Sequence, residues 1–261
     1  MRLILFKFIL KGVYLTLYSL FMAQKIRHAI ILAGGKGERL RPYTEDRPKP
    51  MVLVGGKPIL AYQLEQLKAA GIEEVVFALS YHKEALQEHV GKGEKYGLRV
   101  NYSIEETPLG RGGGIKLAMK QLDHGDFEDV LVINGDNLWK MDLPKLMTKH
   151  QEREAIVTLT VVPLKSPYGI VEFNEKSQVL GFKEKPVLPH WVNAGIYIFS
   201  KEIERLLPDN GDHETETFPM LSKEKFLVFT STDYWRGVDT VKDLTEAEKE
   251  VAEIFGATPK K

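Results

Sequence analysis

Short, mainly apolar segments alternate with amphipathic ones through the first half of the chain. His28–Ala33, Glu74–Leu79 and Val130–Ile133 are too short for buried helices and are typical of buried parallel strands. Between them, Ile59–Ala70 and Gly114–Leu122 carry apolar residues three and four positions apart, which predicts helices packed on a sheet. This alternation predicts an α/β class: a Rossmann-like, mixed and mostly parallel central sheet with helices on both faces.

The second half has β-branched segments that alternate less regularly with helices. We expect them to extend the same sheet as mixed strands, followed by a charged helix at 240–255. The expected strands are Ala155–Val162, Gly169–Phe173, Val179–Lys183, Val192–Phe199 and Phe226–Ser231. No linker rich in Pro, Gly or Ser interrupts the chain, so we expect a single domain over 23–261, with lobes at about 27–150 and about 151–261.

The first 22 residues differ from the rest, being strongly apolar with Arg2, Lys7 and Lys11 as their only charges. The uncharged stretch at 12–24 has 13 residues, which is short of the roughly 20 that a membrane helix needs. No small-residue cleavage site follows it, which argues against a secretory signal. We therefore expect 1–22 to be a non-structural leader or a mis-assigned start, with translation beginning at Met22, and we expect no membrane attachment.

The composition excludes several classes of protein. Basic and acidic residues number 36 each, so no long-range field favours binding to nucleic acid. The chain has no cysteine, which removes disulfides, thiolate nucleophiles, thiolate zinc sites and iron–sulfur clusters and fits a cytoplasmic location. The seven histidines form no HxxxH or HExxH pair, and no Gly-x-Ser-x-Gly motif occurs, so zinc chemistry and hydrolase triads are disfavoured.

A glycine-rich turn follows the first predicted strand directly. Gly34, Gly35 and Gly37 carry no Cβ, so backbone N–H groups there can approach an anion closely. By themselves, three glycines in a strand-to-helix connection indicate only a tight turn, but Arg39 and Lys49 add the positive charge that a phosphoryl group requires. The turn is neither a Walker A loop nor GxGxxG, and we interpret it as a phosphate-binding loop.

An acidic residue ends another of the predicted buried strands. In VLVINGD, Asp136 stands at the carboxyl end of its strand, where an open α/β sheet places its ligand. The spacing alone supports a metal ligand and a turn-capping residue equally.

Gly34–Met51, GGKGERLRPYTEDRPKPM, resembles the sequence pattern of the sugar-1-phosphate nucleotidyltransferases, the NDP-sugar pyrophosphorylases. That pattern is GGxGTRLxPxT followed by a spacer and PKPM or PKPL, and Glu38 here replaces its threonine. The resemblance runs from about Arg27 to Val251. It implies the nucleotide-diphospho-sugar transferase fold, with nucleotide bound by the first lobe and sugar by the second.

The resemblance also implies roles for individual residues. The loop would surround the NTP triphosphate, with Arg39, Lys49 and Asp136 catalytic; its nucleotide-binding residues would be Leu32, Ala33, Gly34, Gly35, Gly37, Arg39 and Lys49. The segment EETPLGRGGG is similar to the base-recognition loop of the family, which places Leu109 and Gly110 at the nucleobase. Arg111 there replaces a small residue and either reaches a phosphate or, as we slightly prefer, lies in solvent.

Two further sets of residues follow from the resemblance. Asp136 would coordinate Mg²⁺ together with Asp239, whose segment YWRGVDT looks like the W-x-x-x-D-T form of the cytidylyltransferase branch. The segments around Gly169, Glu184–Lys185 and Asn193 match the sugar side of the family: Glu184 would accept hydrogen bonds from sugar hydroxyls, and Lys185 would pair with the sugar phosphate.

A sugar 1-phosphate is already an anionic nucleophile, so its attack on an NTP needs no general base. We expect in-line transfer of a nucleotidyl group that gives NDP-sugar and pyrophosphate, with mannose 1-phosphate and GTP as the favoured pair. Glucose-1-phosphate thymidylyl-, uridylyl- and cytidylyltransferases are alternatives. A catalytically silent nucleotide-sugar-binding subunit is an alternative of another class, a glycosyltransferase is a weaker one, and homo-oligomerisation stays open.

Overall fold

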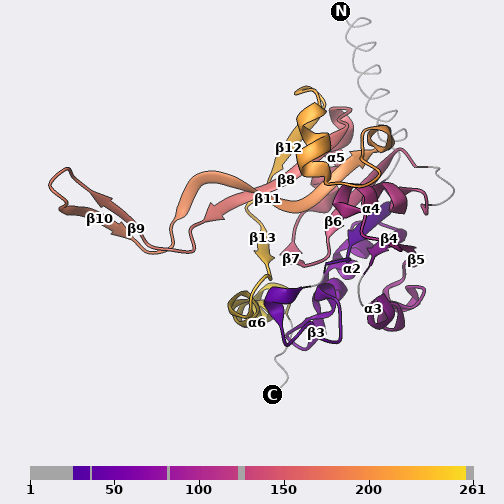
Figure 1. Ribbon diagram of the computed structural model, residues 1–261, viewed down its shortest axis with the longest axis horizontal. Helices are drawn as coiled ribbons and strands as arrows, with labels where there is room; N and C mark the ends of the chain where they lie inside the picture. The colour runs from indigo at the N-terminus through magenta and orange to yellow at the C-terminus, as the bar shows by residue number, and fades with distance from the viewer. Residues whose placement is uncertain (1–25, 36, 81–82, 123–126, 257–261) are drawn as a thin grey trace, which may run out of the picture.

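The computed structural model describes residues 26–35, 37–80, 83–122 and 127–256, so the leader predicted at 1–22 lies outside the described residues. A seven-stranded sheet forms the centre of the molecule, in the order β12-β8-β11-β6-β1-β4-β5 (Figure 1). Its strands are β1 (His28–Leu32), β4 (Glu74–Leu79), β5 (Arg99–Ile104), β6 (Asp129–Asn134), β8 (Val157–Lys165), β11 (Val187–Ser200) and β12 (Phe226–Thr230). Only β11 runs antiparallel to its neighbours β6 and β8; the other pairs are parallel.

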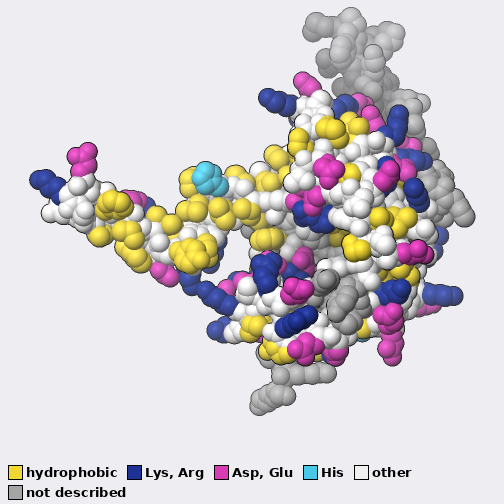
Figure 2. Space-filling model, viewed as in Figure 1, with side chains coloured by type: hydrophobic (Ala, Val, Ile, Leu, Met, Phe, Trp, Pro, Cys, Tyr) yellow, Lys and Arg dark blue, Asp and Glu magenta, His cyan; other side chains and the backbone are white. Residues whose placement is uncertain are grey.

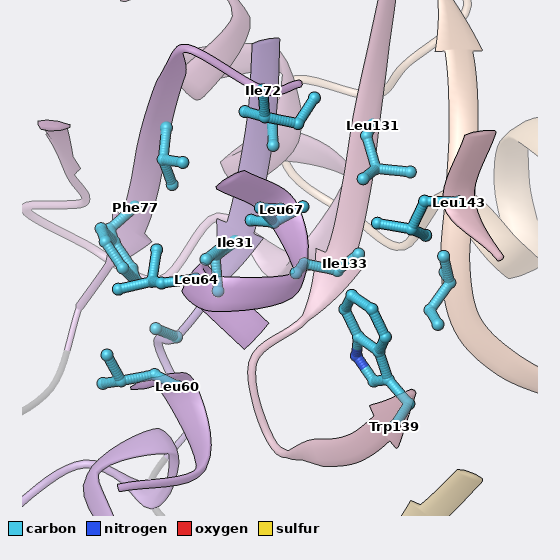
Figure 3. Packing of buried hydrophobic residues seen from close by; sticks show 14 of the residues in the cluster. Ile31, Leu60, Leu64, Leu67, Ile72, Phe77, Leu131, Ile133, Trp139 and Leu143 are labelled. Atoms are coloured by element: carbon cyan, nitrogen blue, oxygen red, sulfur yellow. The ribbon is translucent and has the colours of Figure 1, made fainter. Parts of the chain in front are cut away.

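Helices cover both faces of this sheet because successive strand residues point to opposite sides. Ile31 faces a cluster that contains Leu60 and Leu64 of α2 (Figure 3). Ile30 faces a cluster that contains Ile115 of α4. The helices are α2 (Ile59–Ala69), α3 (Lys83–Val90), α4 (Gly110–Met119), α5 (Leu143–Glu152) and α6 (Val241–Phe255). The predicted α/β class, mixed and mostly parallel with helices on both faces, is confirmed. Within the described residues, no helix is long and apolar enough to cross a membrane.

Small elements close the end of the sheet at which β1 and β6 finish. The hairpin of β2 (Leu53–Val54) and β3 (Lys57–Pro58) packs with α6, and β7 (Asn137–Lys140) pairs antiparallel with β13 (Tyr234–Gly237). These elements share a third apolar cluster that includes Leu40, Leu138 and Val251. They therefore join the carboxyl-terminal helix to the loop that follows β1.

Helix α4 begins four residues before the predicted Gly114, at Gly110. The start was misplaced because glycines are poor helix formers and normally indicate a loop. Here a Cβ on Gly112 would lie 2.8 Å from Cγ of Pro208 and 2.9 Å from the backbone nitrogen of His213. The glycines allow the helix to approach the 208–213 segment closely.

Two of the strands expected in the central sheet form a separate hairpin instead. β9 (Ile170–Phe173) and β10 (Val179–Lys183) pair only with each other, so the expectation that they extend the sheet is wrong. The last β8–β11 pair is Lys165 with Val187. The hairpin of β9 and β10 follows this end of the two strands and projects away from the body (Figure 1). We call residues 168–191 the arm.

Candidate active site

The loop after β1 is fixed on both sides by hydrogen bonds. Ser80 Oγ donates to the carbonyl of Gly34 (2.7 Å), and Thr44 Oγ1 donates to the carbonyl of Gly37 (2.8 Å). Gly37 has φ +64°, and a Cβ there would lie 2.9 Å from Cγ2 of Thr44 and 3.3 Å from Cβ of Lys49. Only a glycine fits this position, and the turn consequently packs against the stem of Lys49.

Lys49 begins a short 3₁₀ turn, Lys49–Met51, between Pro48 and Pro50. Its side chain is buried, and its ammonium contacts two carboxylates. The distance is 2.7 Å to Asp136 Oδ2 and 2.7 Å to Asp239 Oδ1. The single cation therefore contacts both aspartates that the sequence predicted as metal ligands.

The pairing of β7 with β13 brings these aspartates together. Asp136 directly precedes β7 and Asp239 follows β13 by two residues, and the register places Gly237 opposite Asn137. A capping box at the start of α6 then fixes Asp239: the backbone N–H groups of Asp239 and Thr240 donate to Asp243 Oδ2 at 3.2 and 2.8 Å. On the other side, the buried Gln63 amide donates to the carbonyls of Asn134 and Asn137 and holds the turn that carries Asp136.

The electrostatics of the cluster favour the charged carboxylate at Asp239. Partial burial disfavours that charge, but the hydrogen bond from Lys49, with the positive charges of Lys49 and Arg39, lowers the pKa of Asp239 below its ordinary value. Arg39 Nη2 lies 3.0 Å from Asp239 Oδ1. The predicted catalytic residues and the second predicted metal ligand thus form one group of two cations and two anions.

Two adjoining cavities, of about 350 and about 550 Å³, meet at this group. The smaller is lined by Leu32, Ala33, Gly34, Gly35, Lys49, Pro50, Ala78, Ser80, Glu105, Pro108, Gly110, Arg111, Asn134 and Asp136. The larger is lined by Gly35, Gly37, Glu38, Arg39, Lys49, Asp136 and Asp239. Beside them, the Leu109 N–H donates to Glu105 Oε2 (2.9 Å). The structure brings together the predicted nucleotide-side residues and both predicted metal ligands.

The donor set suits a divalent cation that shares its coordination with a substrate. The described residues contain no cluster of three or more His, Cys, Asp or Glu that could hold a metal alone. Asp136 and Asp239 nevertheless converge on one cationic centre, the Lys49 ammonium. Mg²⁺ typically takes one or two carboxylates, with phosphate oxygens and water as its other ligands, so this pair fits Mg²⁺ in the presence of a nucleotide.

Arg111 is exposed, as the preferred expectation has it, but it is paired with two carboxylates. Its Nε donates to Asp212 Oδ2 (2.7 Å) and its Nη2 donates to Glu214 Oε2 (2.8 Å). Burial disfavours the guanidinium charge, but these two carboxylates raise the pKa of Arg111 overall. Arg111 ties the base-loop end of α4 to the 208–217 segment.

Glu214 extends this connection to β11. Its Oε1 accepts from Asn193 Nδ2 and from the Tyr197 hydroxyl, both at 2.7 Å. Asn193 Oδ1 in turn accepts the N–H of Gly195 (2.8 Å). Sequence reasoning missed Glu214, because an acidic residue in the irregular segment DHETET belongs to no motif that we used.

The remaining predicted sugar-side residues lie apart from the cavities. Gly169, Glu184 and Lys185 belong to the arm, and neither cavity, as the described residues define them, is lined by these three or by Asn193. A Cβ on Gly169 would lie 3.1 Å from Glu184 Oε2, so these two residues are close to each other. Their role in binding the sugar stays a prediction.

The chain is similar to known proteins over most of its described length. The family model described as "Nucleotidyl transferase" matches residues 28–254. A mannose-1-phosphate guanylyltransferase of Mycobacterium tuberculosis is 35% identical over 88% of this chain, which spans 66% of that relative. A D-glycero-α-D-manno-heptose 1-phosphate guanylyltransferase of Aneurinibacillus thermoaerophilus is also 35% identical, over 85% of this chain and 97% of its own length.

A solved structure shares the fold over a similar extent. The crystal structure of HddC from Yersinia pseudotuberculosis has a TM-score of 0.69 and 30% identity over 86% of this chain and 99% of its own. That protein has also been crystallised in complex with GMP-PN.

Proposed function

Since the chain belongs to the nucleotidyl transferase family, we propose that it transfers a nucleotidyl group from an NTP to a sugar 1-phosphate and releases pyrophosphate. The observation that carries this proposal is the meeting of Arg39, Lys49, Asp136 and Asp239 at two cavities beside a glycine loop. A silent binding protein would need the loop and the base contacts, but it would not need two carboxylates that converge on one cation.

The chain's own groups can position and stabilise the reactants without a proton transfer. The sugar phosphate supplies the attacking oxygen, and the α-phosphorus–oxygen bond to pyrophosphate breaks as the new bond forms. Lys49, Arg39 and the amides of the 33–37 loop would stabilise the charge on departing pyrophosphate. Mg²⁺ held by Asp136 and Asp239 would supply positive charge between two phosphorylated reactants that repel each other.

The nucleobase would occupy the smaller cavity near Leu109 and Gly110, whose position depends on Glu105. For the nucleotide we propose GTP, and for the acceptor a manno-configured sugar 1-phosphate. The names of the guanylyltransferase relatives support this choice. Because the relative that this chain spans almost fully acts on a heptose, the heptose 1-phosphate is a second candidate beside mannose 1-phosphate.

A substrate matrix tests the proposal. Pyrophosphate release should be measured with GTP, dTTP, UTP and CTP, each with mannose 1-phosphate, the manno-heptose 1-phosphate and glucose 1-phosphate, with and without Mg²⁺. We expect the highest rate with GTP and a manno-configured sugar, and none without Mg²⁺. Release of pyrophosphate only with another base would overturn the guanylyl assignment. Nucleotide-sugar binding with no release in any combination would support the silent subunit instead.

A further inference from the structure

The Lys49 ammonium lies between the two carboxylates that would hold the metal ion. Its Nζ donates a hydrogen bond to Asp136 Oδ2 and another to Asp239 Oδ1, both at 2.7 Å. Among the described residues, the only other cationic side chain paired with either acid is Arg39, which contacts Asp239 alone. Lys49 is therefore the one described cation that bridges the pair.

The ammonium and a divalent cation compete for these carboxylates. Mg²⁺ lies about 2.0–2.1 Å from its oxygen ligands, so an ion on either contacted oxygen would stand within about 5 Å of Nζ. Two cations at that separation repel each other strongly in a partly buried site. The ion would also take from Lys49 the negative charge that balances it, so the pair of acids serves either the ammonium or the ion.

The charge balance of the group disfavours an ion in the absence of a nucleotide. Two carboxylates, one ammonium and the Arg39 guanidinium have a formal charge of zero, and the charge of the ligands sets the affinity of such a site for a divalent cation. Basic and acidic side chains are interspersed over the body of the molecule in Figure 2, so no wider field of one sign adds to the attraction. Access is not the obstacle, because the side chains of Asp136 and Asp239 are 36% and 45% exposed.

Lys49 is held so that its tip can change partners without a movement of its backbone. The residue is fixed in the 3₁₀ turn between Pro48 and Pro50, and its side chain is only 9% exposed. The glycine loop packs on its stem, since a Cβ on Gly37 would lie 3.3 Å from Cβ of Lys49. An ammonium on a flexible stem that leaves the aspartates consequently stays beside the loop to which the proposed function assigns the triphosphate.

We propose that Lys49 is a built-in counterion that makes metal binding conditional on the nucleotide: a divalent cation enters between Asp136 and Asp239 only when a triphosphate has drawn the ammonium to itself. The inference rests on the proposed function, from which it takes both the ion and the triphosphate. By linkage, the nucleotide raises the affinity for the ion, and the ion raises the affinity for the nucleotide by the same factor. Departure of the phosphates reverses the exchange and releases the ion.

Mn²⁺ binding to the protein without nucleotide tests this exchange in the absence of turnover. The electron paramagnetic resonance signal of free Mn²⁺ falls as the protein binds the ion, so a titration gives Kd. We expect Lys49→Met to bind Mn²⁺ at least about tenfold more tightly than the wild type, because the two acids lose the cation that balances them. A misfolded variant would not gain a site, and the double variant Lys49→Met/Asp136→Asn should lose the gain.

Two controls separate competition at the acids from the effect of net charge. Arg39→Gln removes one positive charge from the same group but leaves the ammonium between the acids, so its gain should be well below that of Lys49→Met. Lys57→Met removes a charge that pairs with Glu65 away from the cavities and should bind Mn²⁺ as the wild type does. No gain in Lys49→Met, or an equal gain in Arg39→Gln, would overturn the proposal.

The same titration with saturating GTP, corrected for Mn²⁺ bound by free GTP, measures the coupling directly. The ratio of Kd without GTP to Kd with GTP should be at least about tenfold larger in the wild type than in Lys49→Met. Equal ratios would show that the ammonium has no part in the dependence and would also overturn the proposal.

The Mn²⁺ titration and the pyrophosphate assay can fail separately. A gain in Lys49→Met, together with a wild type that releases no pyrophosphate in any substrate combination, would support the counterion and reject the proposed reaction. Pyrophosphate release by the wild type, with no gain in Lys49→Met, would support the reaction and reject the counterion.

Discussion

The ammonium of Lys49 lies 2.7 Å from the carboxylate of Asp239, although 190 residues separate them in the chain. The same ammonium contacts Asp136 at the same distance. A bound cation and nucleotide would compete with Lys49 for these carboxylates and would free its charge for the phosphates. Lys49 is therefore placed to balance the two acids in the free protein and the phosphates in the complex.

Replacing Lys49 with Met should remove most of the activity. The buried methionine keeps the apolar stem but removes one of the two side-chain cations that would stabilise the departing pyrophosphate, so kcat should fall on the order of a hundredfold or more. Pyrophosphate release under saturating substrates measures this change. Lys57→Met is the matched control, because Lys57 pairs with Glu65 away from the cavities and its variant should keep wild-type turnover. Equal rates in the two variants would remove Lys49 from the mechanism.

Asp136→Asn should reduce both turnover and metal binding. It keeps the size of the side chain but removes one of the two negative charges that converge on the Lys49 ammonium. We expect a loss on the order of a hundredfold in turnover, and weaker Mn²⁺ binding, measured by electron paramagnetic resonance in the presence of nucleotide. Asp209→Asn, at an exposed ion pair with Lys116, is the control and should change neither. Unchanged turnover of Asp136→Asn would defeat the assignment.

Glu214→Gln tests a positioning role for the network behind the base loop. The amide retains size but breaks the ion pair with Arg111, so α4 and the base loop should lose support while the reacting groups stay in place. We expect KM for the nucleotide to rise about tenfold, the loss of about 1.4 kcal/mol of binding, with little change in kcat. Glu202→Gln, on an exposed turn, is the control. A fall in kcat with constant KM would contradict the positioning role.

Most residues on the nucleotide side of the site could be predicted from the sequence, because short local patterns determine their positions. The strand before Gly34, the loop, the PKPM segment and the acid after VLVI are each fixed by neighbouring residues, and the structure places them as predicted. The proximity of Asp136 and Asp239 is different: it depends on the pairing of β7 with β13, two short strands almost a hundred residues apart. The family resemblance suggested that pairing of acids, whereas periodicity could not.

The structure of the sugar side was harder to predict, because the local pattern of a strand does not show which other strand it pairs with. The alternation in 170–183 correctly indicates two strands, yet nothing in it shows whether they join the sheet or each other. Likewise, Arg111 is a surface-like residue by sequence and acquires its partners only when Asp212 and Glu214 fold against it.

His213 should make the protein less stable as the pH falls. Its ring is buried among Tyr197, Phe199 and Phe218, and neither ring nitrogen has a hydrogen-bond partner among the described residues. Burial lowers the pKa of His213 to about 4, whereas the unfolded chain would bind a proton at about 6.5. The unfolded state therefore takes up the proton first, and the stability present above pH 6.5 declines as the pH falls toward 4.

Chemical denaturation of the wild type and of His213→Leu between pH 7 and pH 4 measures this contribution. The free energy of unfolding of the wild type should decline by about 3 kcal/mol more than that of the variant over this range, which is the value of a shift of 2.5 pKa units. At pH 7 the variant should be the more stable by about 1–3 kcal/mol, because leucine leaves no buried nitrogen unpaired. Parallel curves for the two proteins would show that His213 binds its proton equally well in the folded and unfolded states. Acid sensitivity would then have to come from carboxylates that are paired in the fold, such as Asp239, whose lowered pKa also favours the folded state only while the group stays ionised.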